Sequence, residues 1–170
     1  MLSKLIRSTL AVLFLSLPAS PQSPAPQKTP ALIPLEAFLG EWSCSGKFEG
    51  SGKVIEAHQS FRYDLDNKWI LFRHDDQPPF LYHALAEWGW DKPRNELVMF
   101  VQDSGGGIRK FHSPGMQSGE LVWDGDALRA PDPERERFTF QTIDSSHFKV
   151  SYFVLRDNAW KLVDASLCSK

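Results

Sequence analysis

One stretch of this chain holds several histidines and carboxylates, which are the side chains that bind a metal ion or form an acid–base pair. His74, Asp75 and Asp76 are consecutive, and His83 and Glu87 follow shortly after. In a strand, His83 and Glu87 would share a face but lie about 13 Å apart, too far to bind one metal ion. We therefore interpret this group as polar residues at the end of a strand and predict no metal site.

A second candidate for chemistry is the segment 115–119, Gly-Met-Gln-Ser-Gly. Its serine is one position away from the Gly-x-Ser-x-Gly pattern of hydrolase nucleophiles, and it lies among turn residues rather than between a strand and a helix. The pair Asp124 and Asp126 is typical of a turn, because Asp side chains hydrogen-bond to the nearby backbone. We predict no catalytic residue, and an enzymatic function ranks third among our hypotheses.

Aromatic residues are the best candidates for binding, since the chain contains six Trp and twelve Phe. Such side chains either fill a small β-barrel or line an apolar cavity inside it, and the sequence leaves both alternatives open. Arg73 shares a strand face with Trp69 and Leu71, so we expect it to be the polar anchor of such a cavity. The predicted lumen residues are Trp69, Arg73, Tyr82, Trp88, Trp90 and Trp123.

These residues belong to short runs in which apolar and polar side chains alternate. Trp42, Cys44 and Phe48 share one face of the run that starts at Gly40. A period of two is typical of a half-buried antiparallel strand. About ten such runs follow one another up to position 168, separated by short turns, among them 124–126. A meander this long must curl or close to hide its edges.

The two cysteines lie in the first and last of these runs. Closure of a barrel places those strands side by side, so Cys44 and Cys168 come within reach of a disulfide, which a sandwich explains less well. The alternative is a pair of reduced, buried thiols.

The N-terminal segment indicates export. Residues 1–19 combine Lys4 and Arg7 with an apolar run at 10–17, which is typical of a signal peptide and too short to span a membrane. The alternative is an uncleaved apolar N-terminus. Residues 20–34 are rich in Pro and predict a disordered tether, and a single turn at 35–39 opens the folded domain, 35–170. We expect a periplasmic or secreted protein.

Charge argues against one class of partner. The formal net charge is −2, and it becomes −5 without residues 1–30. No cluster of Lys and Arg occurs, so we predict no nucleic-acid partner.

Several motifs resemble known families. Gly40-Glu-Trp42 resembles the Gly-x-Trp entry of the calycin barrels, in which the Trp closes one end under a basic side chain from a late strand; Arg156 and Lys161 are the two candidates for that cation. More widely, the chain resembles a bacterial family of secreted calycin-like proteins of unknown function over residues 35–170. The motifs that carry this likeness are Leu35-x-x-Phe-Leu-Gly-x-Trp42, Trp123-Asp-Gly-Asp-x-Leu128, Arg137-Phe-Thr-Phe140, 144–148 and Trp160 with Leu167-Cys168.

The segments Phe72-Arg-His74 and Pro79-Phe-Leu-Tyr82 are similar to those of nitrobindin-type barrels, which bind haem. Those barrels supply the iron ligand from a His in the final strand. This chain has no His after His147, so we predict no haem and no other cofactor.

The sequence thus predicts an all-β fold: a closed antiparallel up-and-down barrel of about ten strands, calycin-like. The first functional hypothesis is binding of a small apolar or amphipathic molecule in an aromatic lumen. The second is a filled barrel that acts through its surface as a structural or interaction module.

Overall fold

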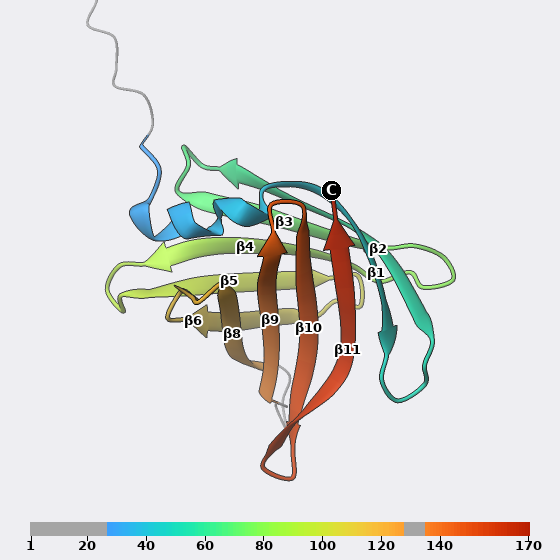
Figure 1. Cartoon of the computed structure of the whole chain (residues 1–170). Coiled ribbons are helices and arrows are strands. Elements are labelled where there is room, and N and C mark those ends of the chain that lie inside the picture. The colour runs from blue at the N-terminus through green and yellow to red at the C-terminus, as the bar shows by residue number, and fades with distance from the viewer. Residues whose placement is uncertain (1–26, 128–134) are drawn as a thin grey trace, which may run out of the picture.

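A computed structural model describes residues 27–127 and 135–170 (Figure 1). The predicted signal peptide and the first part of the predicted tether lie outside the described residues. The elements are the 3₁₀-helix η1 (Pro30–Phe38) and the strands β1 (Gly40–Phe48), β2 (Val54–Asp64), β3 (Trp69–Asp76), β4 (His83–Asp91), β5 (Glu96–Asp103), β6 (Ile108–Ser113), β7 (Met116–Gln117), β8 (Glu120–Ala127), β9 (Arg135–Asp144), β10 (His147–Arg156) and β11 (Ala159–Ser169).

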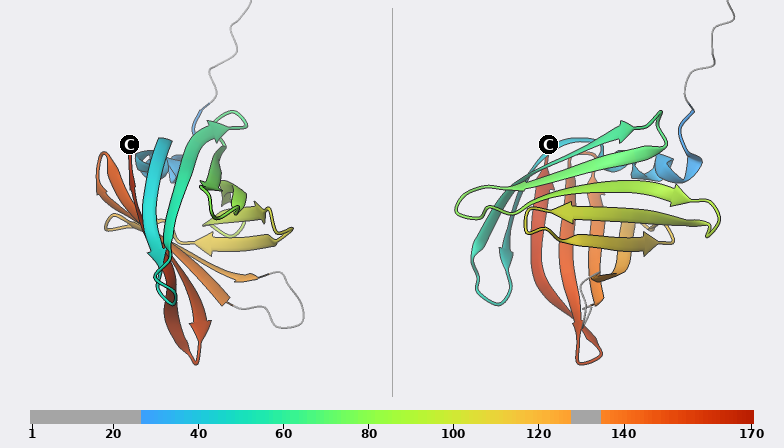
Figure 2. Two further views of the ribbon diagram at one scale, coloured as in Figure 1. Left: turned by 90° about the vertical axis from the view of Figure 1, so that its right-hand side faces the viewer. Right: turned by 180° about the vertical axis from the view of Figure 1, so that it is seen from behind.

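The strands form one antiparallel sheet that closes on itself. Consecutive strands pair from β1 to β6 and from β8 to β11, while β1 pairs with β11 and β6 pairs with β8. In the described part of the chain this gives a ten-stranded barrel, with the two-residue strand β7 added beside β8. Strands β3–β6 form one wall and cross the direction of β9–β11 on the other (Figure 2). The predicted up-and-down barrel is therefore confirmed.

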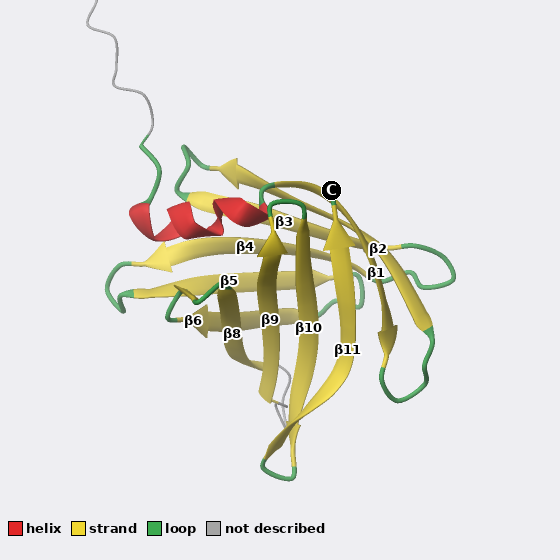
Figure 3. Ribbon diagram, in the orientation of Figure 1, coloured by secondary structure: helices red, strands yellow, loops and turns green. Residues whose placement is uncertain are grey.

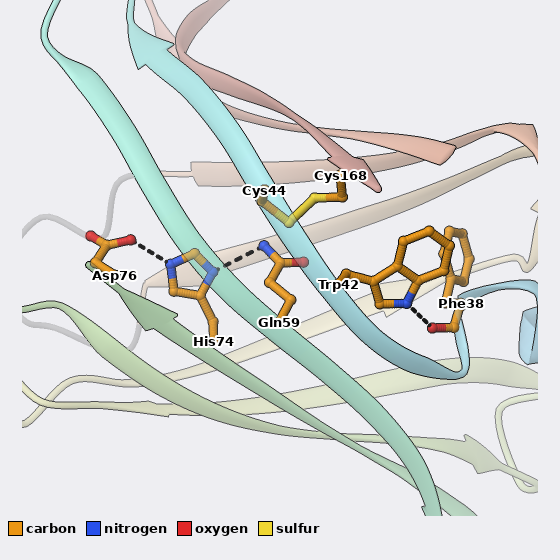
Figure 4. Close-up of a disulfide and its surroundings, with 7 residues drawn as sticks. All are labelled: Phe38, Trp42, Cys44, Gln59, His74, Asp76 and Cys168. Carbon is orange, nitrogen blue, oxygen red and sulfur yellow. Dashed lines mark hydrogen bonds and ion pairs between the residues drawn. A yellow bond between two sulfur atoms is a disulfide. The ribbon is translucent and has the colours of Figure 1, made fainter. Parts of the chain in front are cut away.

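A disulfide joins the first strand to the last. Cys44 of β1 lies directly opposite Cys168 of β11 in the register of the two strands, and the two sulfur atoms are bonded (Figure 4). Both side chains are buried. This confirms the predicted pairing and excludes the alternative of two free thiols.

The folded domain begins earlier than position 35. The chain forms a nine-residue 3₁₀-helix from Pro30, where the sequence predicted a tether up to 34 and then a single turn. Leu32, Leu35 and Phe38 of this helix are fully buried, because η1 lies across one end of the barrel and covers it (Figure 3). An apolar residue at position 32 within the Pro-rich segment was the signal for this extension.

Trp42 completes the closure of the same end. Its indole N–H donates to the backbone oxygen of Phe38 at 2.6 Å. The cation above the ring is Lys170, whose Nζ lies 4.5 Å from the ring centroid, so the expectation of Arg156 or Lys161 is wrong. Those two residues lie near the β10–β11 turn, at the opposite end of the hairpin from Lys170.

One predicted turn is also wrong. The segment 124–126 lies inside β8, paired with β6 on one side and β9 on the other. Gly125 is there because β8 runs close to β6: a Cβ at this position would collide with the backbone oxygen of Lys110 and the ring of Phe111. A glycine between two aspartates therefore marks a close approach of strands here, not a hairpin.

The half of the barrel below η1 is filled with rings. Phe38 packs against four other aromatic side chains, at centroid distances between 5.3 and 6.0 Å. Trp88 and Trp123 are fully buried beside them, 5.3 Å apart. The rings of this cluster are Phe38, Trp42, Phe61, Trp88, Trp123, Phe140 and Phe148. Aromatic side chains therefore pack densely at this end of the lumen.

Candidate functional site

The other half of the barrel is hollow. A cavity of about 410 Å³ lies between the aromatic cluster and the end of the barrel away from η1. Phe72 and Phe140 belong both to the core and to the cavity wall, so their rings, 6.1 Å apart and nearly perpendicular, form its floor. Its apolar wall includes Phe72, Ala84, Met99, Val101, Phe138 and Phe140. The sequence left open whether aromatic side chains fill the lumen or line a cavity in it. The structure combines both, because one half of the lumen is filled and the other half is hollow.

Aromatic and aliphatic residues also surround the mouth of the cavity. Phe48, at the end of β1, packs against Phe80 in the β3–β4 connection, with centroids 5.4 Å apart. Leu81, in the same connection, lines the cavity and is 74% exposed. A ligand entering here would meet apolar side chains first.

Three polar side chains from β2 and β3 are linked by hydrogen bonds on the cavity wall (Figure 4). Nε2 of His74 lies 2.8 Å from a carboxylate oxygen of Asp76, and Nδ1 lies 3.0 Å from Nε2 of Gln59. Because the carboxylate accepts only, the proton of a neutral His74 is on Nε2, and Nδ1 accepts from the Gln59 amide. Both nitrogens of His74 are therefore engaged, and Oε1 of Gln59 has no partner among the described residues.

Asp164 of β11 lies on the same cavity wall. Burial raises the pKa of its carboxyl to about 6; the charge of His74 opposes this shift, and that of Asp76 adds to it. Within the described ranges, no side chain or backbone group donates a hydrogen bond to Asp164. Asp164 is half-buried, and a half-buried carboxylate without a donor is a favourable position for a donor from a ligand.

A second set of polar side chains surrounds Arg109 of β6. Its guanidinium donates to the hydroxyl of Tyr82 at 2.6 Å and lies 3.3 Å from Asp103 and 3.4 Å from Glu136. The hydroxyl of Tyr152 donates to the other oxygen of Glu136 at 2.8 Å. Burial raises the pKa of Tyr82, which stays a neutral donor and acceptor at neutral pH. These contacts tie the β3–β4 connection to β5, β6, β9 and β10 beside the cavity.

The charge of the wall is negative. Among the described residues, its lining contains the carboxylates of Asp76, Asp103 and Asp164 but a single guanidinium, that of Arg109. That guanidinium faces two carboxylates, so its own charge is more than compensated. The cavity therefore combines an apolar body with an acidic wall.

The six predicted lumen residues do not lie together in the structure. Tyr82 lines the cavity. Trp88 and Trp123 face inward but lie in the filled half, and Trp90 packs partly buried against that core. Trp69 is on the outer face of β3, where its ring covers Gly89 so closely that a Cβ there would collide with it.

Arg73 also lies on the outer face of β3. Its side chain is 47% exposed and forms a two-pronged ion pair with Asp75, whose carboxylate also contacts Nδ1 of His83 at 2.7 Å. The expected inward orientation of Arg73 is therefore not observed. The reason is that β3 is apolar on both faces: Ile70 and Phe72 face the core, while Trp69 and Leu71 pack on the outside.

The side chains at 74–76 point alternately to the two faces of β3. His74 and Asp76 point into the barrel and Asp75 points out, so these ligand-type side chains do not converge. Across residues 27–127 and 135–170, no three His, Cys, Asp or Glu side chains lie together as a metal ion would require.

The polar wall residues were missed by the sequence analysis, although a signal existed. Gln59 occupies the apolar phase of β2, between Ala57 and Phe61, and Asp164 shares the phase of Cys168. A polar side chain on the inward phase of a strand is either paired or functional. That criterion finds both residues without any motif.

Comparisons with known proteins add little. No family model matches the chain, and no curated protein matches it. Among solved structures, the chain is similar to the crystal structure of a protein of unknown function, of the DUF3598 family, from Nostoc punctiforme. The two share 9% identity over 79% of this chain and 98% of that one, with a TM-score of 0.21. A likeness this low carries no argument.

In the described part of the chain, no helix combines the length and apolar character of a membrane-spanning segment.

Proposed function

We propose that this chain is a calycin-like binding protein that holds a small apolar or amphipathic molecule in the hollow half of its barrel. The observation that carries the proposal is the cavity of about 410 Å³, bounded by aromatic and aliphatic side chains at one end of a barrel whose other end is filled. Binding pockets for small molecules have this size and this mainly apolar lining.

The disulfide supports an exported protein. Cys44 and Cys168 are bonded, and such bonds persist in oxidising compartments such as the periplasm or the extracellular space. This agrees with the signal peptide predicted at 1–19. We propose that the protein meets its ligand outside the cytoplasm.

The test is titration with N-phenyl-1-naphthylamine, an uncharged fluorophore that brightens in apolar surroundings. We expect saturable brightening with the wild-type protein. In Ala84→Phe, a ring enters the cavity from β4, and we expect affinity to fall at least about tenfold. Leu85→Phe is the matched control, because position 85 is next in the chain but on the opposite face of β4.

Two results would overturn the proposal. If the wild-type protein neither brightens the fluorophore nor binds the naphthyl probes described below, the binding function fails and the interaction-module hypothesis is favoured. If Ala84→Phe binds as well as wild type, the fluorophore lies on the outer surface. Far-UV and near-UV circular dichroism verify the fold of each variant, and Val101→Phe replaces Ala84→Phe if the latter does not fold.

A further inference from the structure

Two acceptors on the polar wall of the cavity have no donor among the described residues. The hydrogen-bond chain from Gln59 through His74 to Asp76 uses the amide N–H of Gln59 and leaves its oxygen over. Gln59 is 2% exposed, lines the cavity, and has an oxygen without a partner among the described residues. A buried acceptor without a donor is unfavourable, so a ligand that supplies a donor would relieve this cost.

Asp164 presents a second acceptor on the same wall, and this one is charged. It lies on β11, close enough to His74 and Asp76 for their charges to act on it. Asp76 already accepts from His74, whereas no group in the described ranges donates to Asp164. The carboxylate of Asp164 is therefore the position at which a ligand cation would gain most.

The opposite ligand charge is disfavoured. Arg109 is the one Lys or Arg side chain in the cavity lining of the described residues. Asp103 and Glu136 both contact it, so its positive charge is already compensated, although its Nε–H has no partner in the described residues. A fatty acid or another carboxylate would bring a further negative charge to a wall that already carries an excess of them.

We propose that the ligand is an amphipathic cation, an amine with an apolar body, whose ammonium group pairs with Asp164 while its body lies against Phe72, Phe138 and Phe140. This inference rests on the proposed function and specifies its ligand class. A charge-assisted hydrogen bond to a half-buried carboxylate is among the stronger polar contacts in proteins, so it gives selectivity as well as affinity.

The experiment compares three probes that share a naphthalene ring and differ at the end of a short chain: 2-(1-naphthyl)ethylamine, 2-(1-naphthyl)ethanol and 1-naphthylacetic acid. Isothermal titration calorimetry at pH 7.5 measures each affinity for the full folded domain. We expect the amine to bind at least about tenfold more tightly than the alcohol, and the acid to bind most weakly.

Asp164→Asn keeps the size of the side chain and removes its charge, so we expect the preference for the amine over the alcohol to disappear. Asp66→Asn is the matched control, because it makes the same chemical change in the β2–β3 turn, at the closed end. The backbone there has a φ of 57°, which Asn also adopts readily. This control should keep the preference of the wild type.

The outcomes separate the two proposals. If N-phenyl-1-naphthylamine binds but the amine and the alcohol bind equally, or if the acid binds best, the cation inference is overturned and the binding function stands. Persistence of the amine preference in Asp164→Asn would likewise overturn it. If neither the uncharged fluorophore nor any of the three probes binds, the proposed function itself fails.

Discussion

Gly46 of β1 lies directly opposite Ser166 of β11, and the two strands approach so closely that no side chain fits at position 46. A Cβ there would collide with the side chain and Cα of Ser166 and with the backbone oxygen of Ala165. Ser166 in turn lines the cavity. The close contact of the first and last strands thus continues from the disulfide down to the cavity wall.

Gly46→Ala should therefore be strongly destabilising. The collision is with backbone atoms, which cannot rotate away, so we expect a loss of about 2–4 kcal/mol in the free energy of unfolding, measured by urea denaturation. Gly50→Ala is the control: a Cβ at position 50 meets nothing within 4 Å, and stability should change by less than about 0.5 kcal/mol. Equal effects of the two substitutions would contradict this account of the strand approach.

Removal of the disulfide should also be costly. The bond closes a loop with a sequence separation of 124, for which the chain-entropy model gives about 5 kcal/mol. We expect Cys44→Ser/Cys168→Ser to unfold at a much lower urea concentration than the oxidised wild type. Reduced wild type should resemble the double variant, and a variant as stable as the oxidised protein would show that the bond does not stabilise the barrel.

Asp164 makes stability depend on pH in an unusual direction. Burial raises its pKa from 3.8 to about 6 despite the opposing effect of His74, so the folded state holds the proton more tightly than the unfolded chain does. The stabilisation is complete below about pH 4 and is lost as the pH rises from about 4 to 6. Asp164→Asn should therefore match wild type near pH 4 and exceed it by up to about 3 kcal/mol at pH 7.

Urea denaturation of both proteins at several pH values between 4 and 7 measures this effect. The difference between wild type and Asp164→Asn isolates position 164, because every other ionisable side chain is present in both proteins. A difference that does not vary with pH would show that the carboxyl group is not buried as described.

The division of the lumen predicts different effects for two phenylalanines. Phe148 is buried in the ring cluster, with Trp42 at 4.7 Å, whereas Phe138 lines the cavity. Phe148→Leu should lower stability by about 1–3 kcal/mol and leave the affinity for N-phenyl-1-naphthylamine within about twofold. Phe138→Leu should weaken binding of the fluorophore more than it weakens folding. The opposite assignment of effects would place the ligand in the filled half.

The architecture could be predicted from the sequence because three signals agree. Alternation identified the strands, turn residues separated them, and Cys44 and Cys168 required the first strand to meet the last. Closure follows from these features without knowledge of any side-chain contact. The prediction of a turn at 124–126 was wrong because an Asp-Gly-Asp segment has the composition of a hairpin turn. Only the pairing of β8 with β6 shows why a glycine is needed there.

The candidate site was less predictable. β3 carries apolar residues on both faces, so alternation could not decide whether Arg73 or His74 points inward. The register with β2 decides it, because His74 pairs with Gln59 on the inner face. Asp164 and Arg109 come from distant strands, and their common cavity depends on the curvature of the barrel, which no local pattern records.

The position of η1 has a practical consequence for handling the protein. Thr29, just before the helix, bonds to Asn67 in the β2–β3 turn, and Lys170 lies over Trp42, so both ends of the described chain are at the closed pole. The cavity mouth, with Leu81, is at the opposite pole. Immobilising the domain on a sensor surface through either end of the described chain therefore orients the mouth toward solution, and both geometries should report the same ligand association rate.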